Sequence, residues 1–281
     1  MGLFDMFKSG KKDSTPPINI HPEIKVSDID NGSHGDNIGA LIGFKTLEEG
    51  TGGKIVQEII DQAIATPTNL NYQKYSLHSY TLVRNNSRGA SLNIRALAHR
   101  RQMLSAYPYL KTSYKLPYAT KEIIEWKHVN NCEAEIKGGG RDVFGLDFFP
   151  TDYAINKQRY QENKNIEVHL SALALVVDKH TNDESGETKF SEDFVAYMPS
   201  SRLPRVTYYD FIGMVISCEE VQLDKLNSGY MAKVRLINHD EDPDFLAVEM
   251  FMHKENMRIP SLTPGMKITG LLWFQGEIAS T

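Results

Sequence analysis

Residues 262–278, LTPGMKITGLLWFQGEI, form an apolar run near the C-terminus that decides the fold of the region around it. One set of alternating side chains is wholly apolar, and the other set mixes two large apolar residues with polar ones. Such alternation predicts a β-strand with two chemically different faces. Gly270 and Gly276 lie inside the run, as in strands that bend strongly. The apolar face comprises Ile268, Leu272, Phe274 and Ile278, and the other face comprises Thr269, Leu271, Trp273, Gln275 and Glu277.

Three more runs with the character of strands precede this one, at 208–220, 229–238 and 245–253. They are rich in β-branched and aromatic residues, and the turn-forming stretches LNSG and NHDEDPD separate them. Gly213 lies within the first run and predicts a bend there. Bent strands in this succession indicate a small closed barrel.

The layout resembles an OB-fold over residues 206–279. A long first strand with a central glycine is followed by two further strands and by the phrase LTPGMKITG, which is similar to the start of late strands in OB domains. The resemblance is one of pattern. It implies that the apolar run at 262–278 is the strand that closes a barrel.

The rest of the chain predicts an α+β protein, with an N-terminal mixed helical region followed by a β-rich half that ends in the OB-like barrel. Helical spacing of apolar residues predicts a helix at 53–65, and a second helix is expected at 87–107. The expected regions are a flexible tail and linker at 1–38, a mixed α/β region at 39–140, a β-rich region at 141–205 and the barrel at 206–281.

The composition limits where the protein works. The chain has 281 residues, a net charge of −5 and only two cysteines, which favours a cytoplasmic protein without a disulfide framework. No apolar run is long enough for a transmembrane helix. The N-terminal MGLFDMFKSGKK could make weak contact with a membrane surface, because a short apolar side is followed by lysines.

No motif assembles catalytic chemistry. The glycine-rich EEGTGGKI at 48–55 departs from a phosphate-binding loop, since Glu48 and Ile55 occupy the positions of a glycine and a hydroxyl residue. The histidines and cysteines are scattered, without the spacing of a metal site. We therefore expect no cofactor and no metal, and the main expectation is a non-catalytic protein. An enzyme whose site assembles from dispersed residues stays an alternative.

Residues 84–121 suggest a second kind of function. The segment has eight Lys or Arg residues and no Asp or Glu, with tyrosines between them. Cations for phosphates and flat rings for bases are what a groove for single-stranded nucleic acid requires. The candidate residues are Arg84, Arg88, Arg95, Arg100, Arg101, Tyr107, Tyr109, Lys111, Tyr114, Lys115 and Tyr118.

The charge of the predicted barrel favours a protein partner instead. Residues 206–281 carry six Lys or Arg and eleven Asp or Glu, which would repel phosphates or attract the basic segment of the same chain. The main prediction is therefore a cytoplasmic binding or adaptor protein with an unidentified protein partner. Leu271 and Trp273 are the candidate interface residues, unless the preceding β region packs over them, which is the arrangement we favour.

Overall fold

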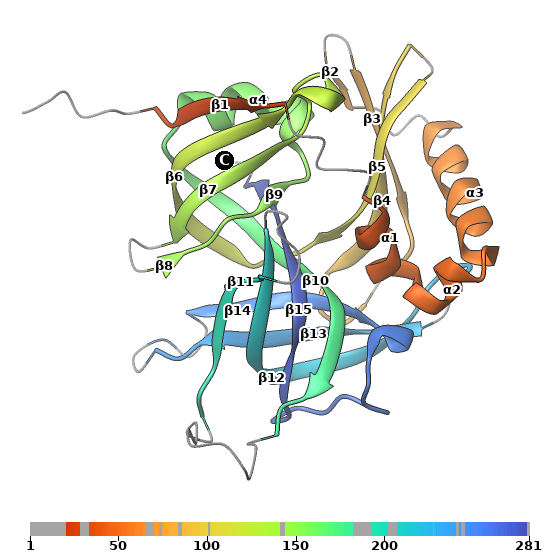
Figure 1. The fold of residues 1–281 in the computed structure, drawn as a ribbon, viewed down its shortest axis with the longest axis vertical. Coiled ribbons are helices and arrows are strands. Elements are labelled where there is room, and N and C mark those ends of the chain that lie inside the picture. The colour runs from red at the N-terminus through yellow and green to blue at the C-terminus, as the bar shows by residue number, and fades with distance from the viewer. Residues whose placement is uncertain are drawn as a thin grey trace, which may run out of the picture.

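The structure, a computed structural model, describes residues 21–28, 34–65, 70–72, 75–83, 86–100, 102–140, 144–181, 191, 193–201, 207–226, 228–239, 242 and 245–279. Strands predominate, helices are few, and one group of strands closes into a barrel, so the expected α+β class with a β-rich barrel is confirmed. Figure 1 shows the barrel at the bottom, a curved group of strands above it on one side, and a smaller sheet with helices on the other.

The barrel consists of β10 (Asn165–Lys179), β12 (Tyr208–Gln222), β13 (Ser228–Ile237), β14 (Leu246–His253) and β15 (Lys267–Ile278). The order around the ring is β12, β13, β14, β10, β15 and back to β12. Only the pairing of β10 with β14 is parallel. The four runs at 208–278 are thus strands, but the ring also needs β10, which lies outside the range 206–281 expected for the barrel. A short strand, β11 (Ala196–Pro199), pairs antiparallel with the first residues of β12.

The alternation in β15 places its two faces as the sequence predicts. Ile268, Leu272 and Phe274 belong to the core that fills the barrel, whereas Leu271 and Trp273 belong to a second core outside it. Gly270 is required where β15 passes β10, because a Cβ at this position would collide with the carbonyl oxygen of Val176. The register of β10 shifts just before that residue, so the two strands approach closely at an irregular point.

The second group of elements contains β1 (Glu23–Ser27), β6 (Lys115–Trp126), η1 (Lys127–Val129), β7 (Ala134–Gly140), β8 (Phe144–Gly145), β9 (Phe149–Pro150) and α4 (Tyr153–Glu162). β10 joins this group to the barrel, because its first residues pair with β6. The apolar interior of the group is continuous with the interior of the barrel through Tyr118, Phe148 and Leu170.

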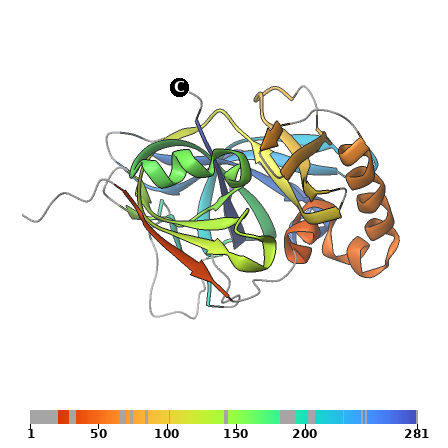
Figure 2. The same cartoon turned by 90° about the horizontal axis from the view of Figure 1, so that it is seen from above.

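The third group is a four-stranded sheet of β2 (Leu70–Tyr72), β3 (Tyr75–Thr81), β4 (Ser91–His99) and β5 (Gln102–Lys111), with α1 (Gly35–Ile42), α2 (Phe44–Glu48) and α3 (Thr51–Ala65). The predicted helix at 53–65 is α3, and Figure 2 shows it on the outer side of this sheet. Between the sheet, the helices and the barrel lies the second core, in which Ile59 and Leu41 join Phe251 and Trp273.

The helix predicted at 87–107 is wrong. The described part of this stretch contains β4 and most of β5, which pair as an antiparallel hairpin. Nearly every residue of β4 is buried, so both faces of the strand are covered and the alternation that identifies a half-exposed strand is absent. The arginines that suggested an exposed helical face include Arg95, which is buried within the strand.

The linker predicted at 1–38 is wrong at two places. Residues 23–27 form β1, which pairs in parallel with β6, and α1 begins at Gly35. Pairing with β6 satisfies one edge of β1, and burial of Leu41 and Ile42 holds α1, although neither stretch has a long apolar pattern. Residues 1–20, which include the stretch expected to contact a membrane surface, lie outside the described residues.

Candidate functional site

β1 presents apolar side chains to solvent. Ile24 is 45% exposed and Val26 is 53% exposed, and both lie on one face of the strand because they are two residues apart. The other face carries Glu23 and Lys25, and Lys25 forms ion pairs with Glu23 at 3.3 Å and with Glu122 of β6 at 3.0 Å. Both faces of β1 are thus exposed, and one of them is aliphatic while the other is charged.

The outer edge of β1 is open in the described part of the chain. Its one strand partner there is β6, on the inner edge. Figures 1 and 2 show β1, in red, along the outside of the molecule, and in Figure 1 β6 is beside it and no strand is labelled beyond it. A strand in this position has backbone N–H and C=O groups that a further strand can use. The two other large hydrophobic side chains exposed among the described residues, Met103 and Met198, lie on separate strands.

Of the cations predicted to bind nucleic acid, those that the structure describes are divided between carboxylate partners and exposed positions. Arg88 lies 3.9 Å from Glu249, Arg95 lies 2.6 Å from Glu277, and Lys115 lies 3.0 Å from Glu167. All three carboxylates are on barrel strands, and two of them, Glu249 and Glu277, lie in the range 206–281 whose negative charge was expected to attract the basic segment. Arg100 and Lys111 are exposed, whereas Arg84 and Arg101 lie outside the described residues.

The tyrosines of the same segment are placed as core residues. Tyr107, Tyr109 and Tyr118 are buried. Tyr114 is partly buried and its hydroxyl donates to the carbonyl of Phe245 at 3.0 Å. Buried rings cannot stack on bases without opening the core, so the described rings and cations of this segment are not arranged together as a nucleic-acid groove requires.

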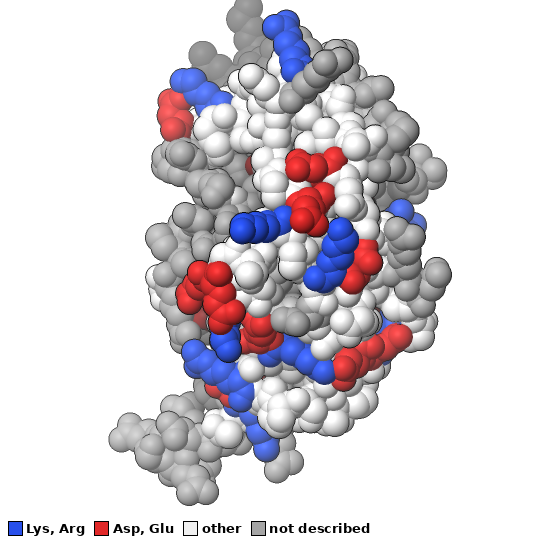
Figure 3. Space-filling view, turned by 90° about the vertical axis from the view of Figure 1, so that its right-hand side faces the viewer, with Lys and Arg blue, Asp and Glu red and all other residues white. Residues whose placement is uncertain are grey.

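The charges on the α3 side of the molecule give no groove of one sign either. In Figure 3 the described Lys and Arg residues of this side lie among Asp and Glu residues. One such pair is Lys225 with Glu58 of α3, at 3.4 Å. Mixed charges of this kind favour solubility and supply little attraction for a polyanion.

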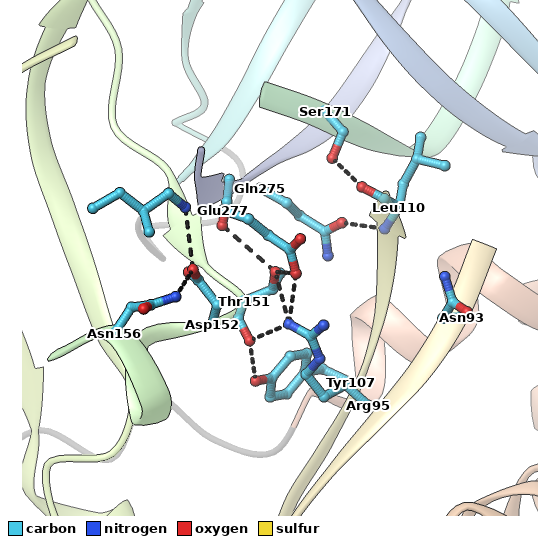
Figure 4. Close-up of polar contacts among 12 residues, drawn as sticks. Asn93, Arg95, Tyr107, Leu110, Thr151, Asp152, Asn156, Ser171, Gln275 and Glu277 are labelled. Atoms are coloured by element: carbon cyan, nitrogen blue, oxygen red, sulfur yellow. Dashed lines mark hydrogen bonds and ion pairs between the residues drawn. The ribbon is translucent and has the colours of Figure 1, made fainter. Parts of the chain in front are cut away.

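The junction between the barrel and the four-stranded sheet is polar and buried (Figure 4). A guanidinium nitrogen of Arg95 on β4 donates to the Glu277 carboxylate at 2.6 Å and to the Thr151 carbonyl at 2.9 Å. The Tyr107 hydroxyl donates to the same carbonyl at 2.8 Å. Burial disfavours the charged form of Arg95, but the Glu277 carboxylate raises the pKa of Arg95 above its usual value. Arg95 is therefore a structural cation held by the barrel.

Asp152 is the second carboxylate of the junction. The hydroxyl of Tyr160 and the amide of Asn156 each donate to it at 2.7 Å, and the backbone N–H of Ile278 donates at 3.1 Å. Burial, together with the charge of Glu277, raises the pKa of Asp152 to about 6. For Glu277 burial acts in the same direction, but Arg95 overcomes it and lowers the pKa of that carboxyl.

A pair of carboxylates with pKa values displaced in opposite directions is a feature of active sites. Here both oxygens of Asp152 accept hydrogen bonds from the chain itself, and the residue is buried. Asp152 therefore holds β15 to the start of α4, and its oxygens are taken up by groups of the chain itself.

Gln275 of β15 completes the junction by pairing with the edge of β5. Its Nε2 donates to the carbonyl of Pro108 at 2.6 Å, and its Oε1 accepts from the N–H of Leu110 at 3.1 Å. The hydroxyl of Ser171 donates to the carbonyl of Leu110 at 2.9 Å. Side chains from two barrel strands thus take the place of a neighbouring strand, and they cover this part of the sheet edge.

The candidate interface residues Leu271 and Trp273 are buried within the chain. Trp273 is 2% exposed, and its ring centroid lies 5.2 Å from that of Phe149 and 5.8 Å from that of His34. His34 is fixed by a 3.0 Å contact with Glu133. An interface role for Leu271 and Trp273 would require these covering segments to move away.

Sequence reasoning missed Ile24 and Val26, because they lie in the stretch predicted to be a linker. The signal was the short alternation EIKVS between His21-Pro22 and Asp28, which is too brief to separate from the surrounding polar residues. Among the residues that the structure describes, no group of three or more His, Cys, Asp or Glu is placed to hold a metal ion.

The comparisons with known proteins give no family: no family model, no curated protein and no solved structure matches this chain. Among the helices that the structure describes, none is long and apolar enough to cross a membrane.

Proposed function

We propose that this chain is a non-catalytic binding protein that acts through protein–protein contacts. The observation that carries the proposal is the pair Ile24 and Val26 on β1, an edge strand with no outer strand partner in the described part of the chain. An open strand edge beside aliphatic side chains suits strand addition, in which the backbone supplies affinity and the side chains supply specificity.

The barrel supports the same class of function. We infer that it is an OB-fold with its last strand placed first in the chain, so that β12, β13 and β14 are the opening meander and β10 pairs in parallel with β14. OB domains bind oligonucleotides on the face of their second and third strands. On the corresponding strands here, Met231 and Phe251 are fully buried in the core beside α1 and α3. The usual ligand face is thus occupied by the chain itself.

The proposal includes a location in the cytoplasm, which is a reducing compartment. The support for it is that Cys132 and Cys218 are both free thiols rather than a disulfide.

The test compares full-length wild-type protein with Ile24→Thr/Val26→Thr, which keeps β-branched residues while removing the aliphatic face. Met198→Thr is the matched control, because Met198 is also exposed but lies on β11. Tagged proteins are incubated with native lysate, and the retained proteins are quantified. We expect specific proteins to be retained by wild type and by the control, and lost with the double variant. Equal retention by all three contradicts the proposal.

A second measurement addresses the nucleic-acid alternative. The pure protein is titrated with labelled single-stranded oligonucleotides at low and at high salt. We expect no binding, because the tyrosines of 84–121 are buried or partly buried and several of its cations are paired. Binding that weakens steeply with salt and is abolished by reversing Arg100 and Lys111 would instead support the nucleic-acid function.

A further inference from the structure

We propose that β1 is a self-association edge, at which two copies of this chain pair as antiparallel strands about a two-fold axis that passes between their two Ile24 residues. This inference rests on the proposed function, since it names the partner of the same strand. Strand addition by an identical copy creates one continuous sheet across the two molecules.

The outer edge of β1 has the features that allow another strand to pair with it. β1 has five residues, and β6 takes up its inner edge alone. The charged side chains of β1 are accessible to a second molecule, because the side chain of Lys25 is 50% exposed and that of Glu23 is 63% exposed. The two side chains also contact each other. Short, charged edge strands resist non-specific pairing, so a partner has to match their pattern.

The sequence of β1 matches itself in one antiparallel register. With Ile24 opposite Ile24 of the second copy, each Glu23 lies opposite a Lys25, and each Val26 lies opposite a Pro22. Directly opposed residues share a face of the sheet, so one face gains two opposite-charge pairs and the other is wholly apolar. Proline tolerates this position because it precedes the strand and need not donate a hydrogen bond.

Neighbouring registers are unfavourable. Centring the pair on Lys25 or on Glu23 places like charges directly opposite each other, which destabilises an antiparallel pair. Shifting the centre to a position between residues places a charged side chain opposite Ile24 or Val26, so neither face is consistent. The charge pattern of β1 thus selects a single arrangement, and that selection is the reason for assigning a second copy as the occupant.

The contact is small, so the dimer should be transient and dependent on concentration. One pair of five-residue strands covers less surface than a stable interface does. Self-association should weaken as salt rises, because its specificity comes from exposed charges.

The experiment is a charge exchange measured by sedimentation velocity on pure full-length protein over a series of concentrations. In a dimer of the Glu23→Lys variant, a lysine at position 23 of each copy lies opposite Lys25 of the other copy. In a dimer of the Lys25→Glu variant, a glutamate at position 25 of each copy lies opposite Glu23 of the other copy. Each variant alone should self-associate about tenfold more weakly than wild type, since two attractive cross-strand pairs become repulsive. When the two variants are mixed in equal amounts, a dimer with one copy of each has opposite charges in both cross-strand pairs. The mixture should therefore associate as wild type does.

Controls separate loss of pairing from loss of folding. Circular dichroism and thermal unfolding establish that each variant is folded, which matters for Lys25→Glu because Lys25 also contacts Glu122. Ile24→Thr is a second variant that changes no charge. It should weaken association by the same factor at low and at high salt. A mixture that associates no better than its components, or a wild type that stays monomeric at every concentration, overturns the proposal.

The outcomes also separate this inference from the proposed function. If the pure protein is monomeric but its retention of lysate proteins still depends on Ile24 and Val26, β1 serves a different partner and the second-copy assignment is wrong. If neither self-association nor retention depends on β1, both proposals fail.

Discussion

Arg95 and Glu277 form an ion pair of 2.6 Å between the four-stranded sheet and the barrel, with side chains 8% and 18% exposed. The guanidinium carbon of Arg95 also lies over the aromatic ring of Tyr109, 3.8 Å from its centroid. A residue that looked like a phosphate ligand in the sequence therefore joins two parts of the fold.

The first prediction follows from this pair. Arg95→Met leaves the Glu277 carboxylate without its cation in a buried position, and we expect a loss of about 3–5 kcal/mol in the free energy of unfolding. Chemical denaturation monitored by tryptophan fluorescence measures it. Arg95→Met/Glu277→Leu removes both charges and should recover a large part of the loss. If the single and double variants are equally unstable, the ion pair does not account for the effect.

The second prediction concerns Gln275. Gln275→Leu preserves volume but removes both hydrogen bonds to the β5 edge, so the Pro108 carbonyl and the Leu110 N–H lose their partners. We expect a destabilisation of about 2–4 kcal/mol, because each unsatisfied buried group costs about 1–3 kcal/mol. Gln222→Leu is the control, since Gln222 is exposed on β12 and its replacement should change the unfolding free energy little. Equal effects of the two substitutions would show that the Gln275 bonds contribute nothing specific.

The third prediction is for Trp273. Trp273→Ala should lower the free energy of unfolding by about 3–5 kcal/mol, because the ring is 2% exposed and packs against Phe149 and His34. Met198→Ala, at an exposed site, should be nearly neutral. Sedimentation of the folded variant should match that of wild type. Wild-type stability together with a loss of association would instead place Trp273 at an interface.

The parts of the fold that could be predicted are those with local signals. The strands at 208–278 alternate or carry β-branched runs, and α3 has helical spacing, so each was identified without its neighbours. The membership of β10 in the barrel could not be found this way, because its central residues 170–175 are buried on both faces and fit any central strand. Its place is decided by pairing with β14 and β15, in which Ser171 lies opposite Glu249 and Val168 lies opposite Ile278, far along the chain.

The candidate site was hidden for the same reason. Five residues of β1 become a strand only because β6 offers a parallel edge, and no local pattern contains that information. Conversely, the cations and tyrosines of 84–121 were correctly seen as unusual, but their carboxylate partners lie on β10, β14 and β15. The composition shows that these cations need anionic partners. Whether the partner is a phosphate or a carboxylate of the same chain depends on the fold.

The fourth prediction concerns Glu135, which lies on β7. Glu135 is 1% exposed, and its two carboxyl oxygens have no hydrogen-bond partner. Burial raises the pKa of Glu135 to about 7; Lys137, at 3.4 Å, opposes the rise and Asp147 adds to it. The folded protein therefore keeps a proton between pH 4.5 and about 7 that the unfolded chain has released.

Stability should consequently fall as pH rises through this window and level off above it, because ionising Glu135 is harder in the folded state. The shift corresponds to about 3 kcal/mol for one group. Glu135→Gln removes the titration, so the variant should match wild type near pH 4.5 and exceed its stability by an amount approaching that value at pH 8. Urea denaturation at a series of pH values measures the difference. If the wild-type and variant curves stay parallel across the window, Glu135 ionises as readily in the fold as in the unfolded chain, and the burial argument is wrong.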